Sequence, residues 1–351
     1  MTALLSLDDM TPASGFVHST AGCAASGGRV AGQDIAGMTP RAFGFTLTNP
    51  DPEVESSTSS LDSAWAPSPC AMPQKVTLRD DPLAAVAAHP SSKTTRSDYI
   101  ERVCAGGFPL ALRRDGVARN RWFDGYVNQS IERDALELAR IRERQVLRDL
   151  LGRLAGRTGQ VLNLSHASDG LGVDRKTAEG YTRLLEDLFL LQRLPAWGKT
   201  LRARAAARPK VHVVDSGLAA RLMRVTPAKL ATLDSTALTE FGSLLETFAV
   251  GELRKQISWL DEQVISGHWM THDGDEVDFV VEFDDGRVLA FEVKANERVS
   301  GRDFKGLRKL RDALGDRLIA GVALSTGLRS YTFEDRLHVM PLDRLWQPVR
   351  L

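Results

Sequence analysis

Residues 276–294 read Glu276-Val-Asp278-Phe-Val-Val-Glu282-Phe-Asp-Asp-Gly286-Arg-Val-Leu-Ala-Phe-Glu292-Val-Lys294. Apolar and polar residues alternate on both sides of a short polar segment, a pattern typical of two strands joined by a turn. The alternation predicts one buried face for each strand, made of Val277, Phe279, Val281 and Phe283 in the first and Leu289, Phe291, Val293 and Ala295 in the second. Asp278, Glu292 and Lys294 fall on the opposite face.

The connecting loop sets how the two strands pair. Both apolar sets face one side only if paired residues have numbers of equal parity, which requires an odd number of loop residues. Asp284-Asp285-Gly286 is such a loop, with glycine at the position that needs a left-handed backbone. In this register Asp278 lies opposite Glu292, with Lys294 two residues further along the same face.

This arrangement of charges predicts a metal site. Two carboxylates a few ångströms apart repel each other, and a hard divalent cation such as Mg²⁺ would neutralise them. Lys294 would then orient a water molecule or stabilise charge that develops on a phosphate. The alternative is that these charged residues only interact with solvent on an exposed strand face.

Asp278 followed by Glu292-Val-Lys294 on the next strand resembles the signature of PD-(D/E)XK nucleases, although Val277 stands where that signature has Pro. The resemblance implies a further carboxylate on the preceding helix, and Glu246 fits within the helical pattern of residues 241–253. It also implies a Mg²⁺-dependent phosphodiesterase. Its metal ligands would be Asp278, Glu292 and Glu246, and Lys294 would complete the catalytic set.

Composition limits the remaining possibilities. Of the 351 residues, 45 are Lys or Arg and 45 are Asp or Glu, so only local patches could attract nucleic acid. The three cysteines are widely spaced, which argues against a zinc site or a disulfide framework. No apolar run is long enough to span a membrane and no export signal is evident, so we expect a cytoplasmic protein without a membrane partner.

The first part of the chain has a different character from the rest. Residues 1–79 are rich in Ser, Thr, Gly, Ala and Pro without a sustained period, and we expect them to be of low complexity and disordered. The glycine cluster at 27–32 lacks the Gly-Lys-Ser/Thr ending of a phosphate loop. We therefore expect no ATP site in this chain.

Residues 80–143 have a helical pattern. Thr95 and Asp98 form a capping signal, and Gly106-Gly107-Phe108-Pro109 breaks the chain. A long helix then carries an aromatic stripe that we expect to pack in a core. Further along, Asp215 or Ser216 is expected to cap a helix through Leu222, after a strand in which His212 has a structural role.

Residues 144–210 resemble a winged helix-turn-helix, with a third helix capped by Asp174. In such a domain the outward cations of that helix and the basic stretch after it would contact DNA. These residues are Arg175, Lys176, Arg183, Lys199, Arg202, Arg204, Arg208 and Lys210. The alternative is a protein-binding module whose basic stretch is a solvated loop.

The order of these segments resembles the C-terminal part of a prokaryotic AAA-type ATPase group, whose ATPase core with its phosphate loop is absent here. The resemblance implies a multidomain α/β chain. A helical segment similar to an AAA lid (80–143) and a winged helix-turn-helix (144–210) would precede a PD-(D/E)XK nuclease-like mixed α/β/α domain (211–347). It leaves two functions open. One is a DNA-binding, Mg²⁺-dependent nuclease, and the other is a non-catalytic DNA- or protein-binding regulatory remnant of such an ATPase, without ATP binding of its own.

Overall fold

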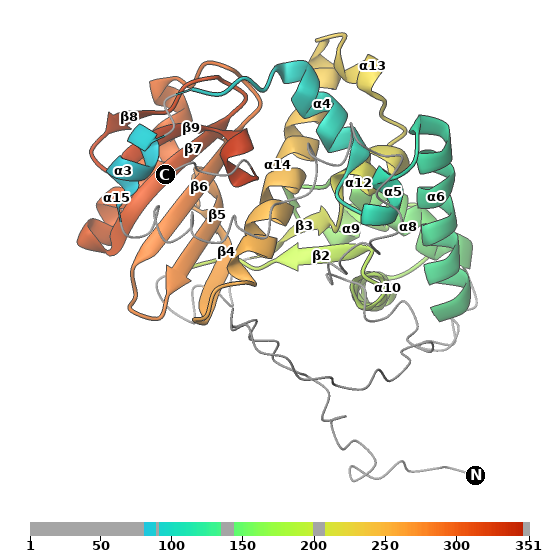
Figure 1. The fold of residues 1–351 in the computed structure, drawn as a ribbon. Helices are drawn as coiled ribbons and strands as arrows, with labels where there is room; N and C mark the ends of the chain where they lie inside the picture. Colours follow the sequence, from blue (N-terminus) through green and yellow to red (C-terminus); the bar gives the residue numbers. More distant parts are fainter. Residues whose placement is uncertain (1–80, 89–90, 135–143, 199–207, 347–351) are drawn as a thin grey trace, which may run out of the picture. The chain divides into compact units, whose positions relative to one another are not determined.

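A computed structural model describes residues 81–88, 91–134, 144–198 and 208–346 of the chain. The predicted low-complexity segment, 1–79, lies outside these residues. The described part combines a helical N-terminal half with a mixed sheet at the C-terminal end (Figure 1).

The first half is built from helices whose ends follow local capping signals. The predicted capping box is confirmed, because the Thr95 side chain accepts from the Asp98 N–H while the Asp98 carboxylate accepts from the Thr95 N–H. The helices are α3 (Pro82–Ala88), α4 (Arg96–Ala105), α5 (Pro109–Leu112), α6 (Gly116–Gln129) and a π-helical turn, η5 (Ser130–Asp134). On α6 the predicted aromatic packing is confirmed, since Phe123 is buried and Trp122 stacks on Tyr126 with ring centroids 5.5 Å apart.

The glycines after α4 are fixed by a carboxylate far along the chain. Asp215 accepts from the Gly107 N–H at 2.6 Å and from the Leu218 N–H at 2.8 Å, so it caps α12 (Ser216–Leu222) as predicted. Gly106 has φ of +74°, and a Cβ there would meet the Asp215 carboxylate. The Gly-Gly sequence thus lets the chain pass close to a half-buried acid.

A small sheet follows. The three strands of this sheet and the helices between and before them are α8 (Arg144–Ala155), β1 (Gln160–Val161), α9 (Leu164–Ala167), α10 (Arg175–Asp187), β2 (Leu191–Leu194) and β3 (Lys210–Val213). The strands are antiparallel in the order β1-β3-β2, and Asp174 caps α10 as predicted by accepting from the Thr177 N–H. The domain boundary expected between residues 210 and 211 cuts through β3, which belongs to this small sheet.

The C-terminal half is a six-stranded mixed sheet in the order β4-β5-β6-β7-β9-β8. Strands β4, β5 and β6 are antiparallel, β7 is parallel to β6 and to β9, and β8 is antiparallel to β9. The bounds are α13 (Pro227–Leu230), α14 (Ser235–Ile257), β4 (Val264–Met270), β5 (Glu276–Phe283), β6 (Val288–Lys294), η6 (Gly301–Phe304), α15 (Lys305–Leu314), η7 (Gly315–Arg317), β7 (Leu318–Ser325), β8 (Tyr331–Glu334), β9 (Leu337–Pro341) and η8 (Leu342–Leu345).

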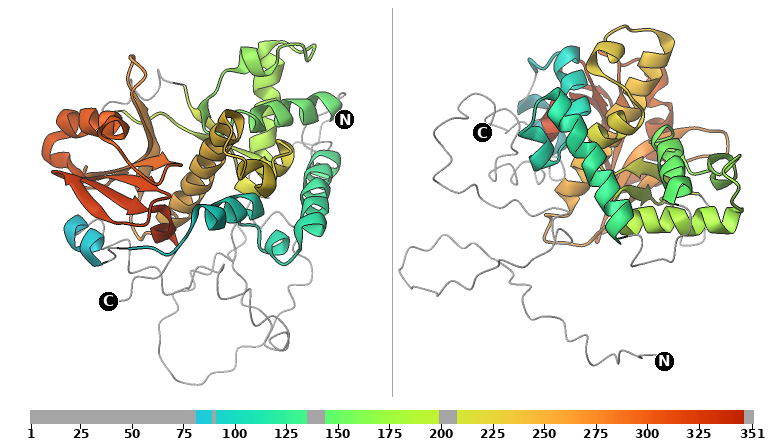
Figure 2. Two further views of the ribbon diagram at one scale, coloured as in Figure 1. Left: turned by 90° about the horizontal axis from the view of Figure 1, so that it is seen from above. Right: turned by 90° about the vertical axis from the view of Figure 1, so that its right-hand side faces the viewer.

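Helices cover both faces of this sheet, α14 on one side and α15 on the other (Figures 1 and 2). Phe279 and Phe291 pack in the core that contains α14, whereas Val280 and Ala290 pack with α15. The hairpin therefore has no solvent-exposed face. Both faces of β5 and β6 are buried, and Asp278 and Glu292 are only 4% and 5% exposed.

The predicted three-residue loop is confirmed. Phe283 donates its N–H to the Arg287 carbonyl across the loop, and Gly286 has φ of +79°. The strand pairs run from Glu282 with Val288 to Phe279 with Phe291, in the predicted register. The paired residues end one position short of the expected pair of Asp278 and Glu292.

A β-bulge explains where the alternation fails. Val280 pairs with Gly267 and Val277 with Trp269, so two residues of β5, Asp278 and Phe279, lie opposite one residue of β4. The extra residue breaks the period of two. Val277, predicted on the same face as Phe279, instead packs in the core on the α15 side.

Candidate functional site

The structure brings a lysine into the centre of the predicted carboxylates. Lys210 at the start of β3 places its Nζ 2.8 Å from the Asp278 Oδ1 and 2.9 Å from the Glu246 Oε1. Glu276 lies slightly further away, at 3.5 Å. The Lys210 side chain is only 2% exposed, so this is a buried ion-pair cluster between the small sheet, α14 and β5.

Backbone features position this cluster. The chain after β2 is bound to β4, because Pro195 and Trp197 form hydrogen bonds with His268. Gly159, with φ of +81°, leaves room for Glu246, since a Cβ there would lie 2.9 Å from the Glu246 Oε2. The small sheet therefore approaches α14 closely enough for Lys210 to reach both carboxylates.

A second lysine serves the other predicted carboxylate. Lys294 Nζ lies 2.7 Å from the Glu292 Oε1, and the Glu292 Oε2 is buried without a hydrogen-bond partner. Asp278, on β5, is also bound to β6, the strand that carries Glu292 and Lys294. Its Oδ2 accepts from the Val293 N–H at 2.9 Å. Thus Asp278 and Glu292 both lie near the end of β6, but each is neutralised by a different lysine.

Burial and the neighbouring charges shift the pKa values of the cluster. Burial alone would lower the pKa of Lys210, but attraction to Asp278, Glu246 and Glu276 outweighs it, and the pKa lies well above its ordinary value. Burial raises the pKa of Glu246 to about 8, the Asp278 charge adds to the rise and Lys210 opposes it. For Asp278 the Lys210 charge outweighs burial, so its pKa is lowered.

These shifts favour a nearly neutral cluster at neutral pH. Lys210 stays charged and pairs with ionised Asp278, while Glu246, with a pKa of about 8, is mostly protonated. Burial, followed by the Asp278 charge, also raises the pKa of Glu292 well above its ordinary value. A buried cluster tolerates charge only when it is balanced in this way.

His212 lies beside the cluster. Burial, and then the Lys210 charge, lowers the pKa of His212 to about 3, so the imidazole is neutral. Its Nδ1 lies 3.2 Å from the Thr247 hydroxyl, which in turn contacts the Thr158 hydroxyl at 2.7 Å. These contacts give His212 the structural role expected of it.

The expected magnesium site stays a prediction. The described residues contain no group of three His, Cys, Asp or Glu side chains placed to hold a metal ion. The Lys210 ammonium already contacts Glu246 and Asp278 where a cation between them would lie. Mg²⁺ binds oxygen ligands at about 2.0–2.1 Å, so it would have to displace this ammonium. The arrangement fits a bound lysine rather than Mg²⁺.

Lys210 requires a correction to the expected DNA contacts. Its ammonium is buried and paired with carboxylates, so it is not on a surface that a phosphate could reach. The sequence placed it at the end of a basic stretch, where a solvated lysine is the ordinary expectation. The only local signal of burial is that it begins the apolar strand Lys210–Val213.

The remaining predicted DNA contacts have different surroundings. Arg175 and Lys176 are exposed at the start of α10 and form no ion pair with another described residue. Arg183 is also exposed but pairs with Glu179 at 3.0 Å. Arg208 is exposed, whereas Lys199, Arg202 and Arg204 lie outside the described residues.

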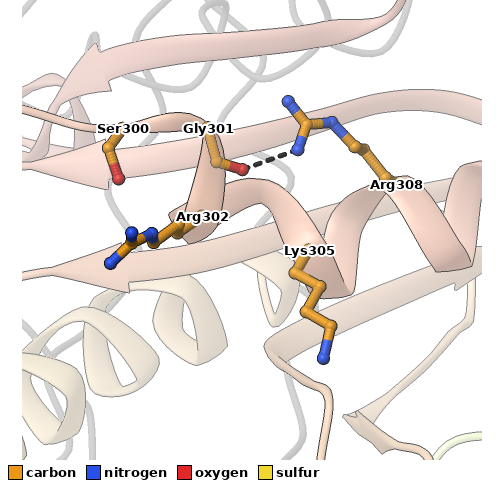
Figure 3. A pocket seen from close by; sticks show the side chains of 5 residues that line it. All are labelled: Ser300, Gly301, Arg302, Lys305 and Arg308. Carbon is orange, nitrogen blue, oxygen red and sulfur yellow. Dashed lines mark hydrogen bonds between the residues drawn. The ribbon is translucent and has the colours of Figure 1, made fainter.

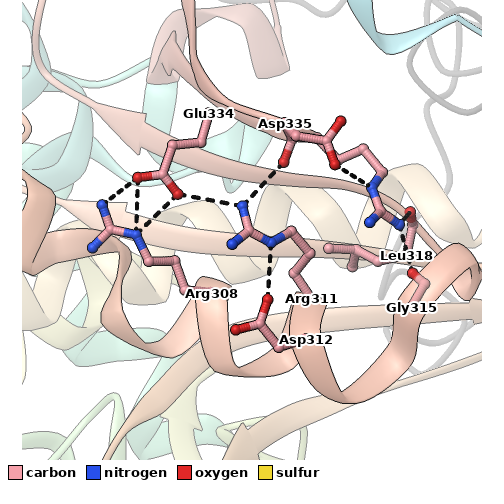
Figure 4. Close-up of polar contacts among 8 residues, drawn as sticks. Arg308, Arg311, Asp312, Gly315, Leu318, Glu334 and Asp335 are labelled. Atoms are coloured by element: carbon pink, nitrogen blue, oxygen red, sulfur yellow. Dashed lines mark hydrogen bonds and ion pairs between the residues drawn. The ribbon is translucent and has the colours of Figure 1, made fainter.

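A cavity of about 810 Å³ lies at the start of α15 and is lined by Ser300, Gly301, Arg302, Lys305 and Arg308 (Figure 3). Its cations are mostly paired. Lys305 contacts Asp275 at 2.7 Å. Arg308 donates to the Gly301 carbonyl (Figure 3) and to Glu334 (Figure 4). Asp275 also pairs with Lys309, and Glu334 also pairs with Arg311, so each carboxylate is shared by two cations.

Two family models match successive parts of the chain. Residues 96–229 match a domain of unknown function (DUF8612), and residues 241–345 match another domain of unknown function (DUF4143). The second match begins in α14 and covers the six-stranded sheet, including Glu246, Asp278 and Glu292. Within the described ranges, no helix has the length and apolar character needed to cross a membrane.

Uncharacterized proteins of Mycobacterium bovis and Mycobacterium tuberculosis are each 26% identical to the chain over 242 residues, which is 68% of this chain and 52% of the relative. The chain thus spans about half the length of these curated relatives. An uncharacterized protein of Haemophilus influenzae is 26% identical over 125 residues, 34% of this chain and 31% of that protein. No solved structure matches the chain.

Proposed function

We propose that this chain is a DNA-binding protein in which a winged helix-turn-helix contacts DNA and a nuclease-like domain serves as a non-catalytic scaffold. The observation that carries the proposal is the outer face of α10, where Arg175 and Lys176 are exposed and form no ion pair with a described residue. Cations that are not neutralised within the protein remain available to DNA phosphates.

The order of elements around α10 supports the winged helix-turn-helix. α8, β1, α9 and α10 precede β2 and β3, and the three strands form an antiparallel sheet in the order β1-β3-β2. The basic stretch of the sequence lies between β2 and β3, at the place of a wing. In this type of domain the second helix of the helix-turn-helix enters the major groove, and α10 has that place here.

The C-terminal half supports a nuclease-like fold without a metal centre. α14 precedes three antiparallel strands, and α15 leads to a strand parallel to the third, an order similar to that of PD-(D/E)XK proteins. However, the lysine at 2.8 Å from Asp278 and 2.9 Å from Glu246 neutralises the carboxylates that such enzymes use. Fold alone does not imply activity.

Fluorescence anisotropy with a labelled DNA duplex tests the DNA contact. We expect the affinity of the full chain to fall with salt, and Arg175→Glu with Lys176→Glu to abolish most of it. Arg298→Glu with Arg329→Glu is the matched control, because both arginines are exposed and the net charge changes equally. No salt-dependent affinity of the unaltered chain would refute DNA binding and favour a protein-binding module.

A Mg²⁺-dependent phosphodiesterase is the second candidate. It is favoured by the Glu292 Oε2, which is buried without a partner beside Lys294. This function requires the Lys210 ammonium to move away from Asp278. Plasmid nicking in the presence of Mg²⁺ that is lost in Asp278→Asn and in Lys294→Ala would establish it and overturn the non-catalytic proposal.

A further inference from the structure

A second cavity lies at the turn between α8 and β1, beside α9. It has a volume of about 370 Å³ and is lined by Arg153, Gly156, Arg157, Gln160 and His166. Arg153 belongs to the last turn of α8, Gln160 to β1 and His166 to α9. Three consecutive elements of the small-sheet region therefore turn polar side chains into one hollow.

The charge of this cavity is not compensated. Neither Arg153 nor Arg157 forms an ion pair with a carboxylate among the described residues. Arg157 Nη2 instead lies 2.7 Å from the His166 Nδ1, and Arg153 donates to the carbonyls of Ala167 and Asp169. None of these partners is a carboxylate, so they hold the two guanidinium groups without cancelling their charge.

We propose that this cavity binds a phosphate group of the DNA backbone. Guanidinium groups present planar sets of N–H donors that match the oxygens of a phosphate, and two of them face one hollow here. The proposal rests on the DNA-binding function above and adds a specific backbone contact to it.

The position of the cavity agrees with this ligand. His166 lies on α9, and residues 168–174 join α9 to the proposed recognition helix, α10. In helix-turn-helix proteins the helix before the recognition helix crosses the DNA backbone. A phosphate next to the groove occupied by α10 would thus meet α9 and the arginines beside it.

The test measures DNA affinity of the full chain against salt concentration. A phosphate contact adds about 0.9 to the slope of log affinity against log salt. We therefore expect Arg157→Gln to lower the slope by about 1 and to weaken all duplex sequences equally. Arg157→Lys, which keeps the charge, should restore most of the slope, and Arg302→Gln, in the larger cavity, should leave it unchanged.

The outcomes separate this inference from the proposed function. An unchanged slope in Arg157→Gln, with binding still lost in Arg175→Glu with Lys176→Glu, would overturn the phosphate pocket and leave DNA binding intact. An equal loss in Arg302→Gln would also overturn it, because the effect would then not be specific to this cavity. Binding of inorganic phosphate at the His166 ring signals in NMR, without any DNA binding, would overturn the DNA backbone as the ligand.

Discussion

Replacing Lys210 with methionine should lower the free energy of unfolding by about 3–5 kcal/mol, the usual result of removing one partner of a buried ion pair. Methionine keeps most of the apolar stem but removes the ammonium that lies 2.8 Å from Asp278 and 2.9 Å from Glu246. Glu246 can take up a proton, because its pKa is already raised to about 8. Asp278 is then left as the uncompensated charge, with the Val293 N–H as its remaining donor.

A second substitution separates the charge effect from the loss of packing. In Lys210→Met with Asp278→Asn no buried charge is left unpaired, and the amide oxygen can still accept from Val293. We expect the loss relative to the unaltered chain to shrink to about 1–2 kcal/mol. Lys305→Met is the surface control. It removes an ion pair to Asp275 whose lysine is 65% exposed, and it should change stability by less than about 1 kcal/mol.

Urea unfolding followed by circular dichroism gives the four free energies needed. The reasoning is refuted if Lys210→Met alone lowers the unfolding free energy by less than about 1 kcal/mol, below the range for a broken buried pair. It is also refuted if the double variant is no more stable than Lys210→Met, because the unpaired Asp278 charge would then not be the cause.

Three further predictions follow from the same geometry. The raised pKa of Glu246, about 8 against an ordinary 4.5, means that its contribution to stability is complete below pH 4.5 and is lost as pH rises through about 8. The urea midpoint should thus depend less on pH between these values in Glu246→Gln, and an unchanged profile would contradict this. Gly217→Ala places a Cβ 2.7 Å from the Ala105 backbone and should lower the unfolding free energy by about 1–3 kcal/mol, whereas Gly180→Ala, in open space on α10, should raise it by about 0.5–1 kcal/mol. Millimolar Mg²⁺ should leave the melting temperature of the unaltered chain unchanged, because Lys210 already neutralises the carboxylates. A rise with Mg²⁺ that disappears in Asp278→Asn would show that the cation competes with the lysine.

Much of the local structure follows from the sequence alone. The loop Asp284-Asp285-Gly286 and the register beyond it depend on strand parity and on one glycine with positive φ. The helix starts at Thr95, Asp174 and Asp215 depend on side chains that bond the backbone within three residues. Such features are determined by neighbours in the sequence, and for this reason a pattern of spacing is sufficient to predict them.

The site is different because its parts are distant in the sequence. Lys210 and Asp278 are 68 positions apart, and only the apolar strand that it begins distinguishes Lys210 from the cations that precede it in the sequence. Burial of the second face of the hairpin likewise depends on α15, which packs against that face. The bulge at Asp278 and Phe279 depends on the pairing of β5 with β4. The sequence by itself therefore determined the hairpin, its register and the carboxylates it carries. Only the tertiary structure decided that a lysine neutralises them, because that depends on which elements pack together and which charges they bury.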